Sequence, residues 1–391
     1  MRELRPLKPA LPQRATLTHL VSAAMAGLLV ALAIAPAEAG PPFPPKRRTT
    51  HHEQSARDYV GREDVRLFIA DMVERHGFVR RELDKLFSKA KFQASIVRAI
   101  TPPATPQARS WQAYRQNFVN AQRIEAGLRF RERHSDTLAR ASAQYGVPEE
   151  IIVSIIGVET VYGRNMGTYR VIDSLSTLAF DYPPRAEFFR NELEQFLLMA
   201  RDNNLDVLGV KGSYAGAIGI PQFMPGSLRR FAVDFDGNGQ TNLSESPVDA
   251  IGSVANFLAS HGWLRNQPIA FAARTDGADS KRVRAMVGAG IKPAVRLAEL
   301  GASGIAVTDL PATLGGDTPF TLVELETPGQ PTEYRMGLQN FYVLTRYNRS
   351  SLYASAVFDL AEALRSAARP VSVLAPVPAA AVPTLSGAGT N

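Results

Sequence analysis

The fold is decided by residues 148–163, which read PEEIIVSIIGVETVYG. Pro148 suits the first turn of a helix, and the acidic side chains of Glu149 and Glu150 suit the positive end of its dipole. Gly163 is typical of the residue at which such a helix ends. Between these signals the run is apolar on every face, so the sequence predicts a helix that is buried all round.

A single carboxylate, Glu159, interrupts the apolar run near its end. A buried carboxylate is costly unless it is protonated or paired, and the loss of water raises its pKa. A general acid that works near neutral pH requires a pKa raised in this way. From this segment alone two interpretations stay open: a catalytic acid, or a structural glutamate bonded to a nearby hydroxyl group or arginine.

Composition restricts the function further. The 391-residue chain is long enough for two or three domains, and its 21% of charged residues is ordinary for a globular protein. The sequence contains no cysteine, which excludes thiol catalysis, zinc–thiolate sites, disulfides and a lipid-modified N-terminal cysteine. The net charge is +7, and the basic residues are dispersed along the chain. Since no nucleic-acid-binding module is present either, we expect the partner to be an anionic envelope polymer or membrane surface rather than nucleic acid.

Residues 1–39 have the pattern of an export signal. A basic start is followed by an uncharged, mostly apolar stretch over residues 20–35 and by Ala37-Glu38-Ala39, a small-x-small cleavage site. The apolar stretch is short for a spanning helix, with an uncleaved anchor as the alternative. We find no second transmembrane candidate and expect no integral membrane segment after cleavage.

Composition and the spacing of apolar residues divide the remaining chain into segments. Residues 40–58 form a proline-rich, basic tether, and residues 370–391 form an uncharged tail that we expect to be disordered. Apolar spacing predicts a helical region over residues 59–135, with helices at 64–75 and 80–90 and one or two longer helices over 111–145. Further helices are predicted at 187–202, 248–260 and 350–367, and strands at 269–271, 320–325 and 342–345 in a small β-containing region over residues 265–345.

Residues 234–245 read DFDGNGQTNLSE and fit the EF-hand calcium-loop pattern D-x-[DN]-x-[DN]-G-x5-E. In such a loop alternate side chains project oxygen atoms toward one point, and Gly239 permits the sharp turn. The candidate ligands are Asp234, Asp236, Asn238, the backbone carbonyl of Gln240, and Glu245. A single loop favours a structural calcium ion over a calcium switch, and a polar turn without metal is the alternative.

Residues 213–225, SYAGAIGIPQFMP, form a third dense segment. Its small residues allow close chain approach, and Gln222 and Phe223 offer an amide group and an aromatic face to a ligand. Small residues that pack a helix crossing are the alternative.

Together these segments resemble a known family. Residues 159–167, ETVYGRNMG, resemble the catalytic signature of the lytic murein transglycosylases, and residues 212–219 and 221–225 resemble the second motif of that family. Residues 340–350, NFYVLTRYNRS, with Tyr353 beyond them, resemble its C-terminal signature. The asparagine-rich calcium loop is similar to that of the membrane-bound lytic murein transglycosylase B type, glycoside hydrolase family 103. The resemblance extends from about residue 60 to residue 368.

The resemblance implies cleavage of the β-1,4 bond between N-acetylmuramic acid and N-acetylglucosamine in peptidoglycan, leaving a 1,6-anhydromuramic acid end. It implies that Glu159 protonates the glycosidic oxygen and then, once ionised, accepts the proton of the muramoyl 6-hydroxyl that attacks C1. The 2-acetamido oxygen of the substrate would support the oxocarbenium charge in place of a second carboxylate. Two alternatives stay open: a hydrolytic muramidase, and a non-catalytic, calcium-stabilised scaffold that binds peptidoglycan.

The resemblance also implies a glycan-binding groove, in which aromatic rings stack on sugars and polar side chains bond acetamido and hydroxyl groups. The residues at the matching positions are Ser213, Gln222, Phe223, Tyr347, Asn348, Tyr114 and Tyr353. Arg185, in the segment YPPRAE, is a further candidate that would meet carboxylates of the substrate. Core tyrosines are the alternative for Tyr114 and Tyr353, and a surface arginine at a helix start is the alternative for Arg185.

The sequence departs from the family pattern at two places. It lacks the cysteine that carries a lipid in the membrane-bound members, so we expect a soluble periplasmic enzyme. The calcium loop is one residue longer before Pro247-Val248-Asp249, so that Glu245 and Asp249 both stay candidates for the closing ligand.

The predicted fold is α+β and mostly helical. A lysozyme-like catalytic core over residues 136–264 would hold Glu159 and the calcium loop, and a C-terminal helix over residues 346–369 would pack back on the first helical region. The expected partners are peptidoglycan glycan strands, with cell-wall synthesis enzymes as further candidates.

Overall fold

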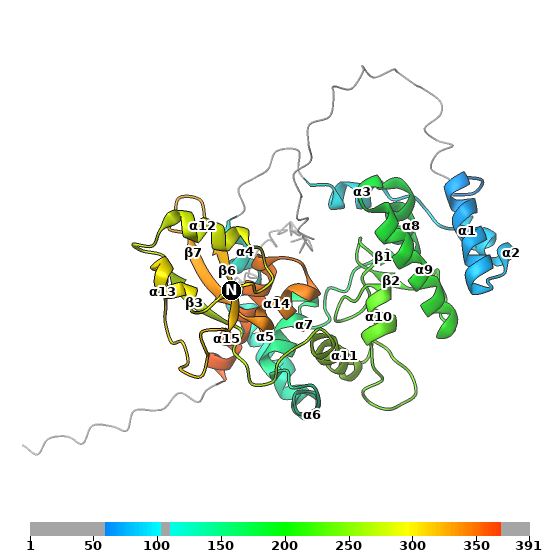
Figure 1. The fold of residues 1–391 in the computed structure, drawn as a ribbon. Helices are drawn as coiled ribbons and strands as arrows, with labels where there is room; N and C mark the ends of the chain where they lie inside the picture. The colour runs from blue at the N-terminus through cyan, green and yellow to red at the C-terminus, as the bar shows by residue number, and fades with distance from the viewer. Residues whose placement is uncertain (1–58, 103–109, 369–391) are drawn as a thin grey trace, which may run out of the picture.

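The structure is a computed structural model that describes residues 59–102 and 110–368 (Figure 1). The predicted signal, tether and C-terminal tail lie outside these residues. The helices are α1 Glu63–His76, α2 Arg80–Phe87, α3 Ala94–Ile100, α4 Trp111–Phe118, α5 Ala121–Arg133, α6 Ser135–Tyr145, α7 Glu149–Thr160, α8 Val171–Asp181, α9 Ala186–Asp202, α10 Pro225–Phe231, α11 Pro247–Ser260, α12 Ser280–Gly288, α13 Glu299–Ser303, α14 Gln339–Tyr347 and α15 Ser351–Ala367. The strands are β1 Tyr169–Arg170, β2 Lys211–Gly212, β3 Ala270–Arg274, β4 Val295–Arg296, β5 Ala306–Val307, β6 Pro319–Leu325 and β7 Glu333–Gly337. The expectation of a mostly helical fold with small sheets is confirmed.

Helix α7 lies at the centre of the larger hydrophobic core. It begins directly after Pro148, and every residue from Ile151 to Val158 is buried, as its continuous apolar sequence predicts. Helices α5, α6, α11 and α15 pack around it. Because neighbours cover all of its faces, any polar group on α7 must be bonded within the protein or lie where the packing opens.

The end of α7 differs from the prediction. The helix stops at Thr160 rather than at Gly163, because Val161 and Tyr162 adopt left-handed backbone conformations with φ of 52° and 61°. The amide of Tyr162 donates to the carbonyl of Ile156 and that of Val161 to the carbonyl of Gly157, which satisfies two carbonyls of the last turn. The sequence did not indicate this ending, since a β-branched residue rarely adopts a left-handed conformation.

Two predicted elements have a different form. Residues 111–145 form three helices, not one or two, because Asn120 caps α5 by accepting a hydrogen bond from the amide of Arg123 and because the chain bends at His134. Residues 342–345, predicted as a strand, lie in α14. The Asn340 side chain bonds the backbone of Leu264 and Gln267 and so fixes the start of α14, a long-range contact that overrides local strand propensity.

The larger sheet is antiparallel with the strand order β4-β6-β7-β3-β5. It contains the predicted strands near residues 269–271 and 320–325, while α12 and α13 were not predicted. Side chains of β6 alternate: Phe320 and Leu322 pack in a cluster with α12, whereas Val323 and Leu325 belong to the core around α7. The sheet therefore joins its own small core to the central helical core.

A second helical core is formed by α1, α2, α3, α8 and α9. The sequence grouped residues 59–135 as one helical region, but the structure divides them: α1 to α3 pack with α8 and α9, whereas α4 and α5 belong to the core around α7. In Figure 1 the sheet and the pair α1 and α2 lie at opposite ends of the molecule, with α7 between them. None of the helices in the described residues combines the length and apolar character that a membrane crossing requires.

Candidate active site

Glu159 lies in the last turn of α7 and is partly exposed, whereas its helix neighbours Val158 and Thr160 are buried. Burial raises the pKa of its carboxyl from the usual 4.5 to about 7, and a hydrogen bond from Tyr353 lowers it by less. A carboxyl that is desolvated yet open at one side can hold its proton near neutral pH and deliver it to a bound molecule. These are the two requirements of a general acid.

Tyr353 is the direct partner of this carboxyl. Its hydroxyl donates to Oε1 of Glu159 over 2.7 Å, and its backbone amide is held by the Ser350 side chain that caps α15. Burial and then the nearby charge of Glu159 raise the tyrosine pKa well above its usual value, so the hydroxyl stays protonated. Tyr353 is thus a fixed donor that supports the ionised form of Glu159.

Tyr347 extends the site from α14. Its ring stacks on that of Tyr353 with centroids 6.3 Å apart, and its hydroxyl donates to the carbonyl of Pro221 over 2.6 Å. Burial first and the charge of Glu159 second raise its pKa well above the usual value. The predicted C-terminal signature and second motif are therefore joined beside the acid.

The loop over residues 213–225 is held in place by its own polar groups. Ser213 Oγ accepts hydrogen bonds from the amides of Ala215 and Ala217, at 3.3 and 3.0 Å. Gln222 Nε2 donates to the carbonyls of Met166 and Gly219, at 3.1 and 2.9 Å. These bonds shape the loop, so the structure assigns both side chains at least a structural part.

This loop is also tied to α7 and to the tyrosines. The hydroxyl of Thr160, next to Glu159, donates to the carbonyl of Ile220 over 2.7 Å. The buried ring of Phe223 packs against Tyr347 with centroids 5.8 Å apart. The loop and the end of α7 therefore form one connected unit around the acid.

The other predicted binding residues are less directly connected to Glu159. The ring of Tyr114 stacks with that of Trp111 and packs at a tilt against that of Phe118 on α4, and Tyr114 raises the pKa of Tyr353 slightly. The guanidinium of Arg185 lies over the Phe188 ring at 4.5 Å, and Arg349 and Tyr214 are among its electrostatic neighbours. Asn348 follows the end of α14 in extended conformation.

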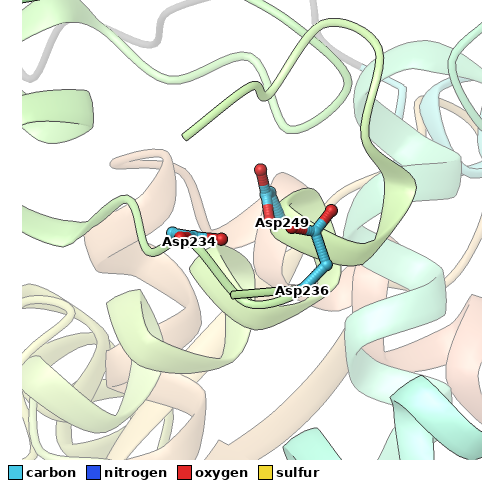
Figure 2. Close-up of side chains that lie close together, drawn as sticks. All are labelled: Asp234, Asp236 and Asp249. Atoms are coloured by element: carbon cyan, nitrogen blue, oxygen red, sulfur yellow. The ribbon is translucent and has the colours of Figure 1, made fainter. Parts of the chain in front are cut away.

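A cluster of carboxylates marks the candidate metal site (Figure 2). Oxygen atoms of Asp234, Asp236 and Asp249 lie within 4.8 Å of one another, and in Figure 2 the three side chains converge. Glu245 does not belong to this cluster, and its carboxylate accepts a bond from Asn242 Nδ2 at 3.3 Å. The structure therefore brings Asp249, rather than Glu245, to the two loop aspartates.

The donor set fits a hard cation. Three carboxylates so close together repel one another unless a cation or a proton intervenes, and Ca²⁺ binds six to eight oxygen ligands of this kind. Asn238 Oδ1 accepts a bond from the Gln240 amide at 2.8 Å, and Gly239 has the φ of 85° that the sharp turn requires. The loop thus presents a suitable turn and suitable oxygen atoms.

Two residues that the sequence analysis did not select hold the end of α7. Arg123 donates from Nη1 to the carbonyl of Gly157, and the hydroxyl of Tyr162 donates to the carbonyl of Arg123 over 3.0 Å. Tyr162 lies inside the catalytic signature, which is a signal that could have identified it. Arg123 lies in an ordinary amphipathic helix, and its sequence context carries no such signal.

A partly open, desolvated carboxyl supported by a tyrosine hydroxyl has the properties that a general acid of a glycosidase-type site requires. The chain belongs to the family described as Transglycosylase SLT domain, which matches residues 61–362.

Individual relatives agree with this assignment. Membrane-bound lytic murein transglycosylase B of Escherichia coli (strain K12) is 42% identical over 320 residues, which cover 80% of this chain and 85% of the relative. The crystal structure of soluble lytic transglycosylase SltB1 from Pseudomonas aeruginosa has 46% identity and a TM-score of 0.71, covering 77% of this chain and 98% of that one. The Escherichia coli lytic transglycosylase Slt35 in complex with calcium has 41% identity and a TM-score of 0.70, covering 82% and 99%.

Proposed function

We infer that the chain is a lytic murein transglycosylase in which Glu159 is the one acid and base. It would cleave the β-1,4 bond between N-acetylmuramic acid and N-acetylglucosamine and leave a 1,6-anhydromuramic acid end. The family membership supports the reaction class. The observation that carries the residue assignment is the carboxyl of Glu159, whose pKa burial raises to about 7 at the end of α7.

The proposed reaction uses this carboxyl twice. The protonated carboxyl donates its proton to the glycosidic oxygen as the bond to C1 breaks. The resulting carboxylate accepts a hydrogen bond from the Tyr353 hydroxyl. It then takes the proton of the muramoyl 6-hydroxyl while the oxygen of that hydroxyl forms a bond to C1. The proton is returned to Glu159 at the end of the cycle, so no water is consumed.

The surroundings of Glu159 favour assistance by the substrate. Within the described residues, no other carboxylate contributes to the pKa of Glu159, whereas glycosidases with two carboxylates place them on either side of the scissile bond. The acetamido oxygen of the substrate would therefore stabilise the positive charge at C1. We propose that the glycan and its appended groups contact the partly exposed side chains of the predicted set, which are Tyr114, Tyr347, Gln222, Ser213, Asn348 and Arg185. The rings of Phe223 and Tyr353 are buried, so they would support the site from within rather than stack on a sugar.

The mass of the products tests the reaction. We expect muropeptides released from purified sacculi to end in anhydromuramic acid and therefore to be lighter by one water than hydrolysed products. The expectation follows because the attacking oxygen belongs to the substrate. Digestion of the same sacculi with a hydrolytic muramidase provides the mass reference, and products that match this reference would establish the hydrolytic alternative.

The pH dependence tests the protonation state of Glu159. Since the protonated carboxyl is the active form, we expect kcat/KM to fall tenfold per pH unit above about 7. Tyr353→Phe removes a hydrogen bond that favours the charged carboxylate, so the pKa of Glu159 rises and the decline moves to higher pH. Tyr334→Phe, which removes a hydroxyl bonded to Glu324 in the sheet, is the matched control and should leave the profile in place. A decline that stays fixed in Tyr353→Phe would show that another group titrates.

We further propose that the loop holds a structural calcium ion. Asp234, Asp236 and Asp249 would supply carboxylates, and Asn238 and the carbonyl of Gln240 would complete the donor set. Asp249, rather than Glu245, would close the site. The calcium complex of Slt35 supports this choice of metal. Bound calcium would supply structural cohesion between the loop and α11 and would take no part in the chemistry.

We place the protein in the periplasm as a soluble enzyme after signal cleavage, because residues 1–39 have the pattern of an export signal. Peptidoglycan glycan strands would be its substrate, and cell-wall synthesis enzymes are candidate partners there. Recovery of the uncleaved chain from a membrane fraction would contradict this placement.

A further inference from the structure

Among the described residues, Arg123 is a buried cation without an acidic partner. It lies on α5 with 9% of its surface exposed, and no carboxylate of the described residues contributes to the pKa of its guanidinium, which burial lowers. Its bonds go to backbone carbonyls: Nη1 donates to Gly157 and Nη2 donates to Asn117 over 3.1 Å. Burying a charge in this way is costly, so its position requires a physical reason.

The end of α7 supplies that reason. The carbonyl of Gly157 belongs to the last turn of α7, where the helix dipole places partial negative charge and a cation is stabilised. The guanidinium also lies 5.4 Å from the centroid of the Phe118 ring. The interaction of the Arg123 guanidinium with the negative end of α7, the helix that carries Glu159, thus offsets part of the hydration that the guanidinium loses on burial.

Tyr162 contacts the same turn at the junction of α5 and α7. It follows Val161, and both residues adopt left-handed conformations that cost energy for side chains with a Cβ. The Tyr162 hydroxyl donates to the carbonyl of Arg123 over 3.0 Å. These contacts hold a strained turn within three residues of the acid.

Two glycines make room for this arrangement. A Cβ added to Gly127 on α5 would lie 2.4 Å from the Tyr162 hydroxyl oxygen, and one added to Gly157 on α7 would lie 2.6 Å from it. The tyrosine therefore fills a space at the α5–α7 contact that exists only because both helices have a glycine there. Arg123, Gly157 and Tyr162 form one contact unit, which we call the α7-end clamp.

We propose that Arg123 and Tyr162 are positioning residues that fix the last turn of α7 and thereby the direction of the Glu159 carboxyl. The proposal rests on the proposed catalytic role of Glu159. The side chain of Glu159 begins two residues after the clamped carbonyl of Gly157 and two residues before the strained Val161–Tyr162 pair. A shift of this turn by about 1 Å would misalign the proton and the glycosidic oxygen, which can cost on the order of 10²-fold in rate.

The test compares Arg123→Met and Tyr162→Phe with Arg129→Met. Arg129 lies on the same helix, is exposed and pairs only with Glu125 among the described residues, so it controls for the loss of a surface arginine. With rates normalised to the folded fraction from circular dichroism, we expect kcat of both clamp variants to fall about 10- to 10²-fold, while KM stays within about twofold. Arg123→Lys keeps the charge but not the forked geometry and should recover part of kcat.

The outcomes separate this inference from the proposed function. If Glu159→Gln is inactive while Arg123→Met and Tyr162→Phe retain the kcat of the control, the clamp has no positioning role. If Glu159→Gln is as active as the wild type, the assignment of the acid is wrong. If Arg123→Met does not fold, Tyr162→Phe decides, because it removes one oxygen atom and keeps the ring that fills the α5–α7 contact.

Discussion

Glu159→Gln should lower the rate of glycan cleavage by about 10²- to 10⁴-fold, the range that a positioned general acid contributes. Glutamine preserves the size of the side chain and can still accept the hydrogen bond from Tyr353. It cannot transfer a proton, and both proposed steps require that transfer. The measurement is the release of muropeptides from purified sacculi at a pH below 7, where wild-type Glu159 is protonated.

Two controls distinguish loss of chemistry from loss of structure. Glu125→Gln changes an exposed glutamate on α5 and should leave the rate unchanged. Substrate binding by Glu159→Gln, measured with soluble glycan fragments, should stay close to that of the wild type, since the aromatic and polar contacts are intact. Equal muropeptide release by wild type and Glu159→Gln would exclude Glu159 as the acid.

The same carboxyl is expected to reduce stability as the pH rises. Its pKa in the folded protein, about 7, lies above the value of 4.5 for an unperturbed glutamate. The folded state therefore binds the proton more tightly, and this contribution is present below pH 4.5 and is lost as the pH rises through 7. Above that pH, Glu159→Gln should be at least as stable as the wild type. A residue that opposes stability but is required for turnover is typical of an active site.

The sequence predicts the placement of Glu159 well because the relevant information is local. A helix that is apolar on all faces must be buried, and a carboxylate near its end must then have an altered pKa. The side chain that bonds Glu159 is not local in sequence, because Tyr353 reaches the carboxyl from α15, far along the chain. The motif resemblance selected Tyr353, but only the fold shows that it bonds the acid directly.

The errors in the prediction have the same origin. Residues 342–345 contain β-branched and aromatic side chains that favour a strand, yet the contacts of Asn340 with Leu264 and Gln267 set a helix there. Arg123 could not be found because its function depends on a carbonyl of another helix. Local propensity and motif spacing contain no information about such contacts.

The candidate metal site shows which part of a ligand set can be predicted from residue spacing and which part cannot. Alternation along residues 234–238 is enough to predict converging oxygen atoms, because it follows from the loop geometry. The choice between Glu245 and Asp249 depends on where α11 begins. Ser246 caps that helix by accepting a bond from the Asp249 amide, and the first turn then directs Asp249 into the cluster.

Asp249→Ala should be the most destabilising of the changes considered, at about 2–6 kcal/mol of unfolding free energy. Its carboxylate is fully buried and accepts hydrogen bonds from the amides of Phe235 and Asn242, at 2.9 and 2.8 Å. Removal of the carboxylate leaves both amides without their acceptor, at about 1–3 kcal/mol each. Urea unfolding in the presence of chelator measures this part of the loss, since no metal contributes under those conditions.

Bound calcium is expected to make a second, separately measurable contribution to the free energy of unfolding. If the ion binds the folded state only, an excess of about 100 times its Kd stabilises the wild type by about 2.7 kcal/mol, and chelator removes this gain. We expect Glu245→Ala to keep the calcium response and Asp249→Ala to lose it, because only Asp249 shares the cluster with Asp234 and Asp236. The reverse pattern would make Glu245 the closing ligand. A wild-type protein whose unfolding is the same in calcium and in chelator would show that the carboxylates are held together by backbone amides alone.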